Sequence, residues 1–109
     1  MDRKKLSGEA LDLIAARFKL LGETSRLKLL IALEEGPKNV GELVDATGLT
    51  QANVSRHLSA LAEGGILTRN REGLNIYYEI ASPEIFEMCE SVCGSLQKRL
   101  DSRAEVFRK

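Results

Sequence analysis

The sequence predicts a mainly α-helical fold with one small antiparallel β-hairpin. Apolar residues recur at helical spacing along most of the chain, which is typical of helices that each bury one face. Residues 66–80 instead hold two short runs with β-branched and aromatic side chains, which favour strands. Glycines lie between the helical runs, so the expected order is four helices, the hairpin and a last helix.

The first two helices can be bounded from their flanking residues. Ser7 is expected to cap a helix that runs to about Leu21, because a side-chain oxygen at a helix start can accept from an unpaired backbone N–H. Thr24 or Ser25 is expected to cap a second helix in the same way. That helix ends at Gly36-Pro37, since proline cannot continue it.

Residues 39–67 predict two short helices joined by a tight turn. The first helix is amphipathic and ends at Gly48, and Thr50 stands where the next helix needs an N-cap oxygen. The core-facing positions of this next helix are Val54, Leu58 and Leu61. Its other face is small or hydrogen-bonding, and no Asp or Glu occurs between Asp45 and Glu63. An acid-free face in a chain rich in acids predicts a helix-turn-helix whose second helix enters a DNA major groove.

The hairpin follows this unit directly, with strands expected at Ile66–Arg71 and Leu74–Ile80 around a turn at Glu72-Gly73. A hairpin after a helix-turn-helix is the winged-helix arrangement. Arg69 and Arg71 alternate onto one strand face and are expected to reach phosphate or the minor groove. The alternative is an ordinary solvated hairpin.

The first and last helices predict a homodimer. The last helix opens at Ser82-Pro83, and the charged segment after Leu100 is expected to fray. Its apolar positions are Ile85, Cys89, Val92, Leu96 and Leu100, and those of the first helix are Ala10, Ile14, Phe18 and Leu21. This surface is longer than one small domain can cover, which indicates an isologous partner. Two recognition helices then require an inverted-repeat target.

Composition narrows the function further. The chain of 109 residues is expected to form one domain, residues 1–109, with 16 basic and 16 acidic residues and zero net charge. A generic polyanion binder would be strongly basic, so any DNA affinity must come from local placement of charge. No apolar run spans a bilayer and no signal peptide is recognisable, which predicts a cytoplasmic protein with reduced thiols. The sequence offers no nucleophile paired with a base, so an enzyme is not expected.

Three segments carry a family resemblance: LLGETSRLKLLIAL at residues 20–33, TQANVSRHLSALAEGGIL at 50–67 and REGLNIYYEI at 71–80. Together they resemble the ArsR/SmtB family of dimeric winged-helix repressors, and the likeness runs from about Leu11 to Leu96. Members of this family occupy operator DNA until an inducer, often a metal ion, releases them. The resemblance therefore implies a DNA-binding transcriptional repressor that responds to stress or metals.

The DNA contacts that this implies fall on the second helix of the helix-turn-helix and on the wing. The candidate residues are Thr50, Gln51, Asn53, Ser55, Arg56, His57 and Ser59, with Arg69 and Arg71. Gln or Asn can pair with adenine, and Arg56 with guanine or a phosphate. For His57, at the flank of the helix, a phosphate contact or an internal hydrogen bond is favoured over a metal ligand.

The inducer is less defined. The place of the family's arsenic-binding cysteine pair reads Asn39-Val40-Gly41, and the places of its zinc ligands hold Ser82, Glu84, Ser95 and Lys98, so neither familiar metal site is expected. Cys89 and Cys93 share a helix face and could hold arsenite, cadmium or copper(I), or form a disulfide or polysulfide. They could equally pack as small hydrophobes. The sequence also allows a repressor without thiol or metal sensing, or a winged-helix protein-interaction module without DNA binding.

Overall fold

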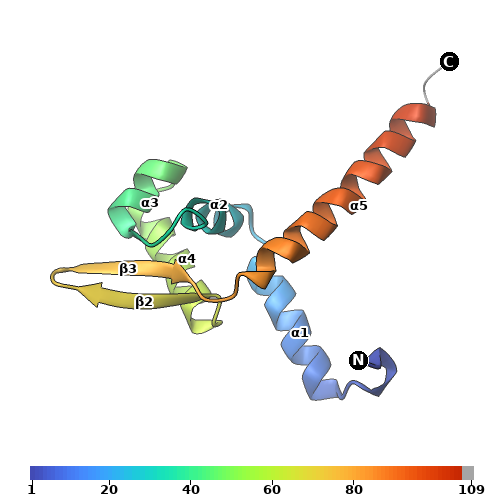
Figure 1. The fold of residues 1–109 in the computed structure, drawn as a ribbon, viewed down its shortest axis with the longest axis horizontal. Helices are drawn as coiled ribbons and strands as arrows, with labels where there is room; N and C mark the ends of the chain where they lie inside the picture. The colour runs from blue at the N-terminus through green and yellow to red at the C-terminus, as the bar shows by residue number, and fades with distance from the viewer. Residues whose placement is uncertain (107–109) are drawn as a thin grey trace.

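A computed structural model describes the backbone of residues 1–106, with side chains through residue 103. Its elements lie at Arg3–Lys5 (a short 3-10 helix), Gly8–Leu21 (α1), Thr24–Leu33 (α2), Lys38–Asn39 (β1), Val40–Thr47 (α3), Gln51–Glu63 (α4), Leu67–Glu72 (β2), Asn75–Ile80 (β3) and Glu84–Val106 (α5). The mainly helical fold with a wing is therefore confirmed. In Figure 1, α2, α3, α4 and the hairpin form one body, while α1 and α5 leave it and diverge from each other.

Three N-caps were expected from the sequence. Those at Ser7 and Thr50 are present, and the one at Thr24 or Ser25 is wrong. Ser7 Oγ accepts from Ala10 N at 3.1 Å, as expected at the start of α1. At α2, however, the N-cap residue is Glu23 and makes no capping bond, and Thr24 is already helical. The carboxylate of Glu23 is instead 3.2 Å from Arg26, so an ion pair replaces the local cap.

The sheet has three strands in the order β1-β3-β2, all antiparallel. The two-residue strand β1 was not predicted, because two residues carry no readable alternation. The hairpin turn is also displaced by one residue: Glu72 pairs with Asn75, and Gly73 takes the turn position with a positive φ of 62°. Glycine adopts this conformation without the steric cost of a Cβ, which places Leu74 in the turn rather than in a strand.

The core lies inside the body, between α2, α3, α4 and the inner face of the hairpin. Its fully buried side chains are Leu29, Leu30, Leu33, Leu43, Val54, Leu58, Leu61, Ile66 and Ile85. The predicted core positions of α4 are thus confirmed. Among its described side chains α1 buries only Leu21, and α5 buries only Ile85, near its start.

The long helix α5 continues through Val106, so the expected fraying after Leu100 is wrong for residues 101–106. That segment lacks glycine and proline and is rich in residues that tolerate a helix, which explains its continuation. Residues 107–109 lie outside the described residues. In the described part of the chain, no helix is long and apolar enough to cross a membrane.

Candidate nucleic-acid interface and apolar groove

The turn between α3 and α4 is built from local hydrogen bonds. Asn39 Oδ1 accepts from Glu42 N at 2.9 Å and Glu42 Oε1 accepts from Asn39 N at 3.0 Å, a reciprocal capping box that starts α3. Gly48 ends α3 with a φ of 74°, a left-handed conformation that suits glycine. Thr50 Oγ1 then accepts from Asn53 N at 3.2 Å and starts α4, as the sequence predicts.

The outer face of α4 is exposed and carries no carboxylate before Glu63. Its exposed candidate residues are Thr50, Gln51, Asn53, Ser55, Arg56 and Ser59. Arg56 Nη2 donates to Asn53 Oδ1 over 3.4 Å, a long contact that ties the guanidinium weakly. Arg56 forms no ion pair within the described residues. Its charge is therefore available to a base edge or a phosphate.

His57 is different, because its side chain is only 4% exposed. Its Nδ1 accepts from Arg26 Nε at 3.0 Å, so the neutral ring carries its hydrogen on Nε2. Arg56 Nη2 lies 3.4 Å from that nitrogen, but two donors cannot bond to each other. Of the two favoured roles for His57, this geometry supports the internal hydrogen bond over a phosphate contact.

The surroundings of His57 also hold its ring neutral. Burial, together with the charge of Arg56, lowers the pKa of His57 below its usual 6.5, and Arg26 adds to this. Glu23 opposes the shift, since its Oε2 lies 3.3 Å from Nδ1. The carboxylate is about half exposed and is shared with Arg26, so burial and the two guanidiniums outweigh it.

The wing presents two arginines on one strand face, as expected. Arg69 and Arg71 are both exposed and share that face with buried Leu67. The Arg69 guanidinium lies 5.8 Å from the centre of the Tyr78 ring, its cross-strand neighbour. Arg71 Nε donates to Gly73 O at 3.3 Å. Both cations are therefore held by the hairpin itself and stay free of acidic partners among the described residues.

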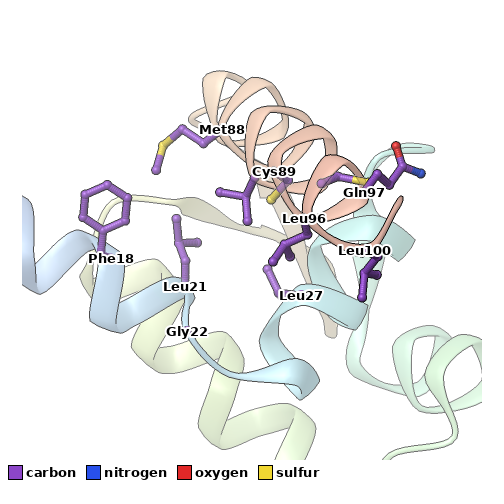
Figure 2. A pocket seen from close by; sticks show the side chains of 11 residues that line it. Phe18, Leu21, Gly22, Leu27, Met88, Cys89, Leu96, Gln97 and Leu100 are labelled. Atoms are coloured by element: carbon purple, nitrogen blue, oxygen red, sulfur yellow. The ribbon is translucent and has the colours of Figure 1, made fainter. Parts of the chain in front are cut away.

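A second surface feature is an apolar groove of about 490 Å³ between α5 and the α1–α2 junction (Figure 2). It is lined by Phe18, Leu21, Gly22, Leu27, Met88, Cys89, Val92, Cys93, Leu96, Gln97 and Leu100. Cys89 and Cys93 are free and exposed in the single chain. Packing inside their own subunit therefore does not explain them. Among the described side chains, which end at residue 103, no group of three His, Cys, Asp or Glu could hold a metal ion.

The structure thus brings most of the candidate residues to one exposed helix face and the wing, and it places both cysteines in a separate groove. Sequence reasoning missed Glu23 and Arg26, the partners of His57. A signal was present: His57 occupies the same helical stripe as Val54, Leu58 and Leu61, so burial could have been predicted. A buried imidazole needs a hydrogen-bond partner, but the sequence does not say which residue supplies it.

Comparisons with known proteins agree with this geometry. Residues 23–69 match the model of the family described as "Bacterial regulatory protein, arsR family". The chain is 34% identical over 91 residues to an uncharacterized HTH-type transcriptional regulator, Rv0081, of Mycobacterium tuberculosis strain H37Rv. That match covers 83% of this chain and 80% of the relative. The crystal structure of Rv0081 superposes with a TM-score of 0.76 and 33% identity, covering 90% of this chain and 99% of the other.

Two further solved structures are similar over most of their length. The homodimeric winged helix-turn-helix DNA-binding domain of Mb0332 from Mycobacterium bovis has a TM-score of 0.74 and 31% identity, covering 94% of this chain and 92% of the other. The antimony-specific transcriptional repressor AntR has a TM-score of 0.76 and 31% identity, covering 93% and 92%. These likenesses include the terminal helices, because matches of this extent exceed the body alone.

Proposed function

The chain belongs to the arsR family of bacterial regulatory proteins, and we propose that it acts as a homodimeric transcriptional repressor whose two α4 helices bind the half-sites of an inverted-repeat operator. The observation that carries this proposal is the exposed, acid-free face of α4, on which Arg56 has no acidic partner among the described residues. Helix-turn-helix proteins place such a face in the major groove. Local placement of charge then supplies the affinity that zero net charge does not.

The dimer is proposed to form through α1 and α5. Phe18 on α1 and Val92, Leu96 and Leu100 on α5 are all more than half exposed in the single chain. Contiguous exposed apolar surface of this kind marks a protein–protein interface. A second copy of the chain would cover it, as the homodimeric state of the Mb0332 domain supports.

The operator contact is tested by a footprint on the DNA upstream of the gene and by a mobility-shift assay. Substituting Arg56→Ala together with Ser59→Ala should weaken operator binding about 100-fold or more, since each good base contact contributes about 1–3 kcal/mol and both protomers lose theirs. The variant should remain a dimer, because both side chains are exposed and distant from the core. Lys28→Ala removes an exposed cation from α2, outside α4 and the wing, and is the matched control. Unchanged binding of the double variant, or no footprint at all, would favour a protein-interaction module instead.

Release is proposed to act through Cys89 and Cys93, which lie one helical turn apart on α5 and line the groove. Two thiolates on one helix face fit a soft cation or metalloid such as arsenite, cadmium or copper(I), and they also fit thiol oxidation or polysulfide. One chain supplies too few ligands for a closed site among its described residues, so a metal would need thiols from both subunits.

The sensing proposal is tested by operator affinity of the wild type, Cys89→Ser and Cys93→Ser. Each is measured with reductant, oxidant, polysulfide, arsenite or cadmium. At least one agent should release the wild type while leaving the variants bound. If every agent acts alike on all three proteins, the cysteines are packing residues.

A further inference from the structure

His57 is the only buried polar or charged residue among the described side chains, although it lies in the helix that carries the DNA-binding face. The proposed DNA contacts do not use it. Its Nδ1 is held at 3.0 Å by Arg26 Nε, from a helix 31 positions earlier in the chain. A polar contact of this kind in the interior fixes geometry, because without Arg26 the buried Nδ1 of His57 would lose its hydrogen-bond donor.

Arg26 joins three elements at once. Its Nη1 donates to Leu20 O in the last turn of α1 at 3.0 Å, while its Nε reaches His57 in α4. Glu23, at the start of α2, lies 3.2 Å from the same Nε and balances the charge. The Arg26 side chain is only 14% exposed, so these charge-assisted bonds are partly shielded from water. The planar guanidinium therefore sets the distance between α1 and α4.

A second tie lies at the end of α4. Arg17 Nη2, from α1, donates to Gly64 O at 3.1 Å. A Cβ built at Gly64 would clash with the Leu20 side chain, so α1 and the end of α4 are in close contact. Of its own residues α1 buries only Leu21. Its apolar contacts with the body are thus few, at Leu20 and Leu21, and the arginine bonds add to the constraint on its direction.

We propose that Arg26 and His57 form a joint that fixes the angle between α1 and the recognition helix α4, and thereby the separation of the two recognition helices in the dimer. The inference rests on the proposed function, in which α1 helps to form the dimer and α4 binds the operator. Because the dimer places α4 through α1, the angle at the joint determines which half-site spacing is bound. Arg26 and His57 are thus positioning residues.

The test compares the footprinted operator with versions in which one base pair is inserted or removed between the half-sites. The wild type should discriminate strongly among the three spacings. His57→Leu should lose about tenfold of this discrimination, which corresponds to about 1.4 kcal/mol. Arg26 Nε retains Glu23 as a partner in that variant, so the fold should persist. His57→Asn should keep the discrimination, because its amide oxygen can accept in place of Nδ1. Lys28→Ala should behave as the wild type.

Equal discrimination by the wild type and His57→Leu would overturn the joint while leaving the proposed function intact. If His57→Leu fails to fold, Arg26→Gln provides the same comparison. A readout without DNA separates the two proposals. Spin labels on Glu63→Cys, in a Cys89→Ser, Cys93→Ser background, report the distance between the α4 helices of a dimer. The distribution of label-to-label distances should be narrow with His57 in place and in His57→Asn, and broad in His57→Leu. Equal widths would contradict the joint whether or not DNA binds.

Discussion

The body buries its apolar residues within the single chain, whereas the two terminal helices leave most of theirs exposed. In the body, Leu29, Leu43 and Leu58 are completely buried by neighbouring helices and the hairpin. On α1 and α5, Phe18 and Leu96 are 58% and 53% exposed, although they recur at the same helical spacing. Periodicity therefore identifies a face that must be buried, but only tertiary structure tells whether the same chain buries it. The body should be stabilised by its own packing, and the terminal helices by a second copy.

The largest effect is expected for a truncation inside the body. Leu58→Ala removes a fully buried side chain where α4 meets the core, and it should lower the free energy of unfolding by about 2–5 kcal/mol. Chemical denaturation, followed by circular dichroism at fixed protein concentration, measures this loss. A loss below about 1 kcal/mol would mean that the core around α4 relaxes much more than dense packing allows.

A charge on the exposed apolar surface should act on association instead. Leu96→Glu puts a carboxylate in the groove and should raise the dimer dissociation constant about 30-fold, equivalent to about 2 kcal/mol, because an unpaired charge would be buried at the interface. Analytical ultracentrifugation checks this. Leu74→Glu, at a wing position that is 96% exposed, is the matched control and should leave association unchanged. Equal behaviour of the two variants would place the dimer interface elsewhere.

A smaller loss of stability is expected from removing the N-cap of α3. Asn39→Ala removes the side-chain half of the capping box at the start of α3 and should cost about 1 kcal/mol. Thermal melts should show the loss at every protein concentration, in contrast to the interface variant. A loss that grows with dilution would instead link α3 to the dimer.

The smallest effect is expected from pH. The pKa of His57 is lowered in the folded chain, so the folded state binds fewer protons than the unfolded state as the pH falls below about 6.5. His57 therefore favours folding most fully above that pH, and its contribution should fall as the pH drops towards the lowered pKa. Denaturation at about pH 7.5 and about pH 5.5 measures the difference, which His57→Asn should reduce. Glu23, Arg26 and Arg56 are the charged groups that face the ring.

The sequence predicted what depends on local pattern. The caps at Ser7 and Thr50, the break at Gly48 and the core stripe of α4 all follow from side chains within a few residues of one another. It did not predict the Glu23 cap position, because that carboxylate is engaged by Arg26 and His57. The candidate DNA residues could be placed on a face from spacing, whereas the burial of His57 depended on a partner distant in the chain. Local patterns do not encode such partners.

The helix α5 is attached to the body at its N-terminal end, so a small rotation there moves its other end over a long distance. With 23 residues the helix is about 34 Å long at the usual rise of 1.5 Å per residue. Ile85 is seated in the core, and just before it Ser82 Oγ donates to Gly65 O, beside the end of α4, at 3.3 Å. A helix held at one end works as a lever, and a tilt of about 10° at its root sweeps the far end through about 6 Å. Conversely, a force applied across the helix near Leu100 acts far from this attachment, so it exerts a large torque on the contact with Gly65.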